Sequence, residues 1–282
     1  MDRSIPSLPV SVLLATLLVA PAFAQVKPAR KAAAPAPVVE VARVLFVLGE
    51  VEVQRQGGAW AQVTEEEPLS IGDRLRTKRG GTARIEFPWT QVAIGDASEI
   101  AIEKAMFLTL RLESGRIDID PEQDLLRVVT DETTISGTGR TLVRREGGVT
   151  FVGSYNGGAS VEAGKEVVRL GVNRGTTVSG GKPPAPSSPL PAPPRVLAPA
   201  SDPRYVRPGE LVHLSWKGEQ ASYHLEVLPI DSDVPVLSLD TDAQEFDLRL
   251  DWLGTFRWRV AGRVGTTESQ PSSEGLICVV EK

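Results

Sequence analysis

Apolar and polar residues alternate at a spacing of two through most of this chain, and glycine-rich turns separate the alternating runs. Between residues 83 and 87, three apolar side chains alternate with Arg84 and Glu86, which is the period of a strand with one buried face. Gly72-Asp73 and Gly80-Gly81 are turn signals next to short runs of alternating apolar and polar residues. Such signals recur about every 8–12 residues, and no window of about 12 residues carries a helical apolar stripe. The sequence therefore predicts an all-β fold.

Three regions follow from this pattern. Residues 38–179 are predicted to form one β domain of many short strands, which leaves open whether they build a solenoid or a sandwich. Within it, Ser114-Gly115 is predicted to turn the chain between two strands. Residues 180–203 are dominated by Pro, Ala and Ser and should form a semi-extended linker. Residues 204–282 carry about six alternating runs, with one Trp early and one late, which fits an immunoglobulin-like β-sandwich.

Residues 1–24 have the pattern of a secretory signal peptide. Arg3 gives a basic start, Val10–Ala20 is apolar, and Ala22-Phe23-Ala24 is a small-x-small signature, so we expect cleavage before Gln25. An uncleaved membrane anchor is the alternative, but the apolar run is shorter than the roughly 20 residues that span a bilayer. Residues 25–37 should be a flexible Ala/Pro-rich tether. We expect an exported protein of the periplasm or the outside that does not span the membrane after cleavage.

The charge balance limits the class of partner. The chain has 31 Lys and Arg against 36 Asp and Glu, and neither half is basic enough to suggest nucleic acid or an anionic membrane surface. The single cysteine, Cys278, cannot form an internal disulfide, and its closing-strand pattern favours a small buried hydrophobe. The glycines lie in turns without a phosphate-cradling arrangement, so we predict no cofactor.

No catalytic grouping stands out. A hydrolase needs a nucleophile, a base and a group that orients the base. The two histidines, His213 and His224, lie in strand patterns and neither neighbours a nucleophile elbow. The acidic pairs Asp231/Asp233 and Asp240/Asp242 are interpreted as turn residues. The sequence therefore predicts that the protein is not an enzyme and has no catalytic residues.

An acidic run invites comparison with a calcium loop. Asp118, Asp120, Glu122 and Asp124 lack the glycine-centred ligand spacing of an EF-hand. On alternation, Asp118 faces away from Ile117, so a solvated strand face is the favoured interpretation and a weak cation site the alternative. We predict no metal site.

Trp89 is the one candidate contact residue. It follows Pro88 at a predicted turn, where a large aromatic side chain gains little from folding unless something covers it. Two interpretations stay open. Neighbouring chain covers the ring, or the ring is a contact for an envelope ligand or a partner protein, since aromatic side chains anchor interfaces.

The N-terminal pattern resembles the FecR family domain. The residues that carry the resemblance, in order, are Gly49-x-Val51, Trp60, Leu69-x-x-Gly72-Asp73-Arg74-Leu75-x-Thr77, Gly81-Thr82-Ala83-x-Ile85, Leu112-x-x-Gly115-x-Ile117, Val129-Thr130, Gly137-Thr138, Gly158-Ala159-Ser160-Val161 and Gly164. One departure is Pro88-Trp89-Thr90, where the family usually turns with Asp-Gly-Ser. The resemblance implies an all-β periplasmic domain without an enzymatic centre. The family's regulator carries a sigma-factor-binding segment and a transmembrane helix, which a signal peptide replaces here, so a direct anti-sigma role is not expected.

The C-terminal unit resembles a fibronectin type III-like sandwich. The residues that carry this resemblance are Leu214-x-Trp216, Tyr223-x-Leu225-x-Val227 and Leu253-Gly254-Thr255-Phe256-x-Trp258-x-Val260. Phe256 stands where such domains often have a corner Tyr, so packing alone must hold that corner.

The leading hypothesis is a non-enzymatic, exported cell-envelope protein that binds or scaffolds an envelope protein or a cell-wall polymer. The alternative is a periplasmic regulatory module that docks on a membrane receptor or transducer. A third hypothesis, an enzyme acting on wall polymers, has the least support. The sequence does not identify the partner or the oligomeric state.

Overall fold

The structure is a computed structural model that describes residues 40–104, 108–119, 126–231 and 235–281. The described residues form 26 strands and no helix, so the all-β prediction is confirmed. None of these residues belongs to a helix long and apolar enough to cross a bilayer. The predicted signal peptide and tether, and the acidic residues Asp120, Glu122, Asp124 and Asp233, lie outside the described residues. The described residues all belong to one compact unit.

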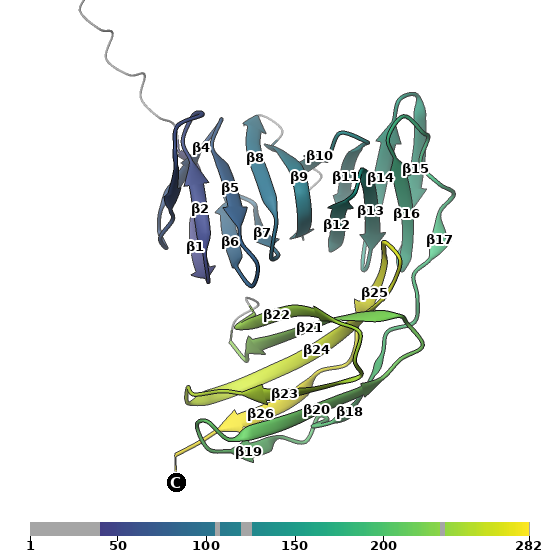
Figure 1. Cartoon of the computed structure of the whole chain (residues 1–282). Coiled ribbons are helices and arrows are strands. Elements are labelled where there is room, and N and C mark those ends of the chain that lie inside the picture. The colour runs from purple at the N-terminus through teal and green to yellow at the C-terminus, as the bar shows by residue number, and fades with distance from the viewer. Residues whose placement is uncertain (1–39, 105–107, 120–125, 232–234, 282) are drawn as a thin grey trace, which may run out of the picture. The chain divides into compact units, whose positions relative to one another are not determined.

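Residues 40–190, called here the first β region, form two layers of strands (Figure 1). Layer A has the order β4 (Pro68–Ser70), β1 (Glu40–Leu48), β6 (Thr82–Phe87), β7 (Thr90–Ile94), β9 (Leu108–Ile119), β12 (Thr141–Glu146), β13 (Val149–Ser154), β16 (Arg174–Ser179) and β17 (Ser188–Pro189). Layer B has the order β3 (Trp60–Gln62), β2 (Val51–Gln54), β5 (Arg74–Thr77), β8 (Glu99–Lys104), β9, β10 (Leu126–Val129), β11 (Thr134–Thr138), β14 (Gly158–Ala163) and β15 (Glu166–Leu170). The strands form two layers, as in a sandwich, but after the first two strands of each layer (β4 and β1, β3 and β2) their order advances with the chain, as in a solenoid.

Strand β9 belongs to both layers. Its first half pairs with β8 and β10 in layer B, and its second half pairs with β7 and β12 in layer A. Gly115 lies at the change of layer with φ of 87°, and a Cβ atom there would overlap Ser98. The predicted turn at Ser114-Gly115 is therefore wrong: the strand continues through a bend that only glycine accommodates.

The core of the first β region lies between the layers. Ile85 and Ile117 of layer A pack in the same buried cluster as Leu75, Ile100 and Leu112. All five side chains are at most 2% exposed. Period-two alternation in each short strand supplies this core, as the sequence predicts.

Residues 195–281, called here the second β region, form an immunoglobulin-like sandwich of two sheets. One sheet has the order β18 (Arg195–Ala198), β20 (Leu211–Lys217) and β23 (Glu245–Arg249). The other has the order β19 (Arg204–Val206), β26 (Gly275–Val279), β24 (Gly254–Val264), β21 (Ser222–Pro229) and β22 (Leu237–Thr241), with β25 (Thr267–Pro271) paired to β24. Trp216 packs against Tyr223 and Trp258 in its core, with ring centroids 5.8 Å and 6.1 Å apart.

The stretch expected as a linker, residues 180–203, contributes to both regions. Its strand β17 pairs with β16 of layer A, and β18 pairs with β20 of the sandwich. Leu190, between these strands, packs against a small buried cluster of Leu142, Phe151 and Tyr155 on layer A. Much of the proline-rich stretch therefore lies against the two regions that it connects.

Gly115→Ala is expected to lower the free energy of unfolding by about 3 kcal/mol, because the new methyl group combines positive φ with overlap on Ser98. Urea unfolding followed by circular dichroism measures the change. Gly171→Ala is the matched control, since nothing lies within 4 Å of its Cβ position and its φ is not positive. Equal stability of the two variants would contradict the role assigned to Gly115.

Candidate functional site

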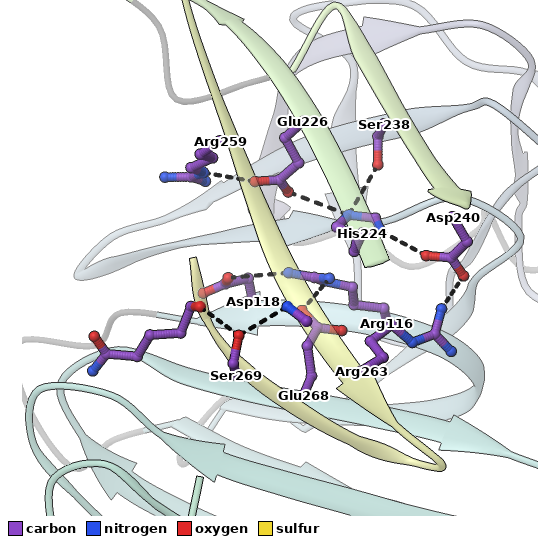
Figure 2. A network of polar contacts seen from close by, with 12 residues as sticks. Arg116, Asp118, His224, Glu226, Ser238, Asp240, Arg259, Arg263, Glu268 and Ser269 are labelled. Atoms are coloured by element: carbon purple, nitrogen blue, oxygen red, sulfur yellow. Dashed lines mark hydrogen bonds and ion pairs between the residues drawn. The ribbon is translucent and has the colours of Figure 1, made fainter. Parts of the chain in front are cut away.

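The most unusual feature of the structure is a band of polar side chains, most of them charged and largely buried, where the two β regions meet. Alternation in β9 and β21 places Arg116, Asp118, His224 and Glu226 on the polar faces of their strands. These two faces meet, so that polar side chains are buried against one another (Figure 2). We call this band the ionic seam, and its members are Arg116, Asp118, Arg140, His224, Glu226, Ser238, Asp240, Arg259, Arg263 and Glu268.

The centre of the ionic seam is the ion pair between Arg116 and Glu268. Arg116 Nη1 donates to Glu268 Oε1 at 2.6 Å, and Glu268 is 1% exposed. Glu268 lies on β25. This strand pairs with β24 of the second β region and contacts β13 and β16 of the first. Burial lowers the pKa of Arg116, but the charges of Glu268, Glu226 and Asp118 together outweigh this and the pKa rises above its usual value. The guanidinium therefore stays charged although it is buried.

Hydrogen bonds beside the Arg116–Glu268 pair also attach β25 to the first β region. Tyr155 Oη donates to the backbone oxygen of Ser269 at 3.3 Å, and Gln270 Nε2 donates to the backbone oxygen of Tyr155 at 3.0 Å. Gln270 Nε2 also contacts Asn173. Because Tyr155 packs in the small cluster on layer A, β25 is bonded to a buried part of the first β region.

Asp118 lies next to Arg116 and forms a bidentate pair with Arg140. Arg140 Nε and Nη2 donate to the two carboxylate oxygens of Asp118 at 3.1 Å and 2.9 Å. Asp118 does face away from Ile117, as predicted, but its side chain is only 17% exposed. The expected solvated strand face is wrong here, because the second β region covers it. The charge of Asp118 raises the pKa of Arg140, against the lowering by burial.

His224 is buried among acidic groups on the second β region. Its Nδ1 lies 2.8 Å from Asp240 Oδ1, and its Nε2 lies 3.5 Å from Glu226 Oε1. Burial and the charge of Arg116 lower the pKa of His224, but the hydrogen bonds to Asp240 and Glu226 together with the negative charges around it, including that of Glu268, raise it to about 9. The imidazole is therefore protonated at neutral pH.

The two carboxylates of this group are held in the charged form. Burial raises the pKa of Glu226, but Arg259, which donates to it at 2.7 Å, and His224 bring that pKa well below its usual value. Burial likewise raises the pKa of Asp240, but the hydrogen bond and the charge of His224, together with the charges of Arg144 and Arg116, bring it below its usual value. Asp240 lies in β22 and also pairs with Arg263, so the interpretation of this residue as part of a turn is wrong.

The connectivity Ser238–His224–Asp240 is that of a serine hydrolase triad. Ser238 Oγ lies 3.3 Å from Nε2 of His224, whose other nitrogen faces Asp240. A general base needs a free imidazole lone pair, which a histidine of pKa about 9 lacks at neutral pH. Glu226 Oε1 also lies 3.5 Å from the same Nε2 that Ser238 contacts. This arrangement therefore supports a structural role for His224 more than a catalytic one.

The second histidine lies away from the ionic seam. His213 is exposed on β20, with Nδ1 2.9 Å from Asp247. Across the described residues, no cluster of three His, Cys, Asp or Glu side chains has the arrangement of a metal site. Cys278 is buried and free, and lies in β26.

A cleft of about 580 Å³ opens beside the ionic seam. Arg84, Glu86, Trp89 and Gln91, from the β6–β7 hairpin, form one wall, and residues of the second β region, including Arg259, form the other. Arg116 and His224 also contribute to a second cavity of about 450 Å³. The cleft walls therefore combine an aromatic ring with charges of both signs.

The environment of Trp89 has features of both interpretations made from the sequence. Its ring is half-buried and packs against the core of the first β region, and its residue lines the cleft. Its buried Nε1 has no hydrogen-bond partner among the described residues. Whether the ring contacts a ligand stays a prediction, but its position in the cleft is compatible with one.

No protein-family model matches the chain, and no curated protein matches it. Among solved structures, it is similar to a candidate anti-sigma factor from Parabacteroides distasonis, at 16% identity and a TM-score of 0.37. That match covers 41% of this chain and 59% of the other, so the chain spans less than two thirds of that protein's length. Domains of titin match at 12% identity and a TM-score of 0.27 over 82% of this chain and 88% of the other. Fibronectin domains of chicken CNTN1 match at 10% identity and a TM-score of 0.26, over 87% and 97%. Likenesses this remote carry no functional argument.

Glu268→Ala is expected to lower the free energy of unfolding by about 3–5 kcal/mol, because it leaves the buried Arg116 without its partner. The double variant Arg116→Met/Glu268→Leu should recover most of this loss, since no buried charge of the pair remains. Denaturant unfolding measures both. Glu40→Ala, which breaks an exposed pair with Arg43, is the control and should cost less than about 1 kcal/mol. A Glu268→Ala variant as stable as this control would contradict the assigned role.

The ionic seam should make stability depend on pH in a defined direction. The pKa of His224 is raised from 6.5 to about 9, so its contribution is complete below 6.5 and is lost as pH rises through about 9. The pKa of Glu226 is lowered from 4.5, so its contribution is present above 4.5 and is lost as pH falls further. Thermal unfolding measured from about pH 6.5 to about pH 10 should show that the Tm of the wild-type protein falls above neutral pH. The fall should be smaller in the His224→Gln variant. An equal fall in both proteins would contradict the assignment.

Proposed function

We propose that the chain is a non-enzymatic, exported protein of the cell envelope that binds or scaffolds a partner in the cleft beside Trp89. The observation that carries the proposal is the cleft itself, whose two walls come from different β regions that the ionic seam joins. A site with walls held in place loses little conformational freedom on binding, which favours affinity.

The chemistry of the cleft favours a polar partner with flat or apolar faces. The Trp89 ring supplies a stacking surface, while Glu86, Gln91 and Arg259 supply hydrogen-bond acceptors and donors. Cell-wall glycans and extended peptide segments both present such faces together with polar edges. An envelope protein or a cell-wall polymer therefore remains the partner class of this proposal.

Export rests on the sequence pattern of residues 1–24, and the resemblance to the FecR family adds the expectation of a periplasmic domain. Fractionation of cells should therefore find the protein in the periplasm or outside. The alternative function is a regulatory module that docks on a membrane receptor or transducer. It predicts that a membrane protein, rather than wall polymer, is crosslinked to residues of the cleft in intact cells.

An enzymatic function has one observation in its favour, the Ser238–His224–Asp240 connectivity. The protonated state of His224 and its contact with Glu226 weigh against it. Hydrolysis of purified sacculi by the wild-type protein that Ser238→Ala abolishes would overturn the non-enzymatic proposal.

Trp89→Ala is expected to reduce retention on the partner, whether purified sacculi or a crosslinked envelope protein, by about tenfold or more, because a half-buried aromatic side chain at a binding site is a common hot spot. Co-sedimentation or crosslinking yield measures the loss. Trp60→Ala is the matched control, since Trp60 is also half-buried but stacks under Arg76 on layer B, 4.1 Å from the ring centroid. Full retention by a folded Trp89→Ala variant would reject the cleft as the binding site.

A further inference from the structure

The second cavity, of about 450 Å³, is lined mainly by charged side chains, and we call it the arginine cavity. Its basic residues from the first β region are Arg116 on β9 and Arg144 and Arg145 on β12. The second β region contributes His224 on β21 and Arg263 on β24. A cavity of this volume is in the range that accepts a small-molecule ligand.

Two arginines of this cavity have spare hydrogen-bond donors. Arg144 Nη1 and Arg263 Nε are buried, and neither atom has a hydrogen-bond partner among the described residues. Arg263 is 8% exposed, and the side chain of Arg144 is 12% exposed. Among the described residues that line the cavity, no other side chain has a buried polar atom without a partner. Because guanidinium nitrogens only donate, these two atoms require a ligand that accepts hydrogen bonds.

The two guanidinium groups lie close together although they come from different β regions. Arg144 Nη2 lies 2.5 Å from Glu146 Oε2, and Arg263 Nη2 lies 3.9 Å from the same oxygen atom. Arg263 also donates through Nη1 to Asp240, which fixes the orientation of its guanidinium (Figure 2). Because both groups lie around one carboxylate oxygen, a single small ligand can contact both.

The acidic residues of the cavity wall are less buried than these arginines, with one exception. They are Asp96, Glu113, Glu146, Asp240 and Glu268. The exception is Glu268, whose charge the ion pair with Arg116 neutralises. The side chains of Glu146 and Asp240 are 66% and 50% exposed, so water screens their charges, and Asp96 and Glu113 are half-buried. The two spare donors therefore belong to buried cations whose acidic neighbours lie largely in solvent, which favours a negatively charged ligand.

We infer that the arginine cavity binds a small oxyanion, a phosphate or a carboxylate group, which accepts hydrogen bonds from Arg144 and Arg263. Guanidinium groups donate charge-assisted hydrogen bonds to such anions in a fixed planar geometry. The bound anion joins the two β regions, since Arg144 belongs to the first and Arg263 to the second. Trp89 does not line this cavity, so the inference does not rest on the function proposed for the cleft.

Isothermal titration calorimetry of the full chain with inorganic phosphate, and separately with acetate, tests this inference at constant ionic strength. The wild-type protein is expected to bind at least one of the two ions, and the tighter of the two identifies the preferred group as phosphate or carboxylate. Arg144→Met is expected to weaken that binding by about tenfold or more, because it removes a charge-assisted hydrogen bond. Arg144 is the residue to change, since its printed ion pair is with the exposed Glu146 and not with the ionic seam. Circular dichroism confirms that each variant is folded.

Two further variants separate anion binding from a merely structural role of Arg144. Arg257→Met is the matched control, because the Arg257 side chain is 17% exposed and pairs with Glu274 but lines neither cavity. It should leave the affinity for the anion unchanged. Glu146→Gln should strengthen binding roughly two- to fivefold, since it removes an exposed negative charge beside the anion.

A folded wild-type protein that binds neither ion at millimolar concentrations would overturn the inference, because water alone would then satisfy the two donors. Equal affinity of the wild-type protein and Arg144→Met would also overturn it, by placing the anion elsewhere. The same holds if Arg257→Met weakens binding as much as Arg144→Met does. Trp89→Ala should bind the anion as the wild-type protein does, so the outcome is independent of the test of the cleft.

Discussion

The buried ion pair between Arg116 and Glu268 is the contact on which the union of the two β regions depends. Removing two charges from water costs several kcal/mol for each ion, and close geometry with further hydrogen bonds must compensate for that cost. The 2.6 Å contact supplies the close geometry, and Asp118 forms a second, longer ion pair with Arg116 at 3.9 Å. An apolar interface tolerates sliding, but a buried charge opposite anything except its partner is strongly unfavourable. The ion pair therefore fixes one register between the regions.

The same constraint explains the charge state of the groups around it. His224 remains protonated because Asp240 and Glu226 accept from it, and these acids remain ionised because His224, Arg259 and Arg263 surround them. Each group depends on the others, so the network behaves as one unit rather than as a set of independent pairs. A cleft beside such a network has charged walls that are already paired, which suits recognition by shape and stacking.

The strands could be predicted from the sequence, but the segments that cover their polar faces could not. Alternation identified the core positions of β6 and β21, because a half-buried strand has a period of two regardless of its partner. It could not show that the polar face of β9, with Arg116 and Asp118, is buried as well, since that depends on a contact with residues about 150 positions later, the separation of Arg116 from Glu268. The bend at Gly115 and the strand position of Asp240 were missed because glycine and aspartate are also the commonest turn residues. The apolar positions change phase across Gly115, from Leu110 and Leu112 before it to Ile117 and Ile119 after it, and this change was the available signal that the strand bends into the other layer there.

The order of strands in the first β region has a consequence for how such a protein can change in evolution. Each strand pairs with strands that are close to it along the chain, so every piece of the sandwich is complete once its immediate neighbours are present. A duplication of one piece would lengthen the two layers without disturbing the packing on either side of it. Proteins of this design can therefore differ in length while they keep the same cross-section.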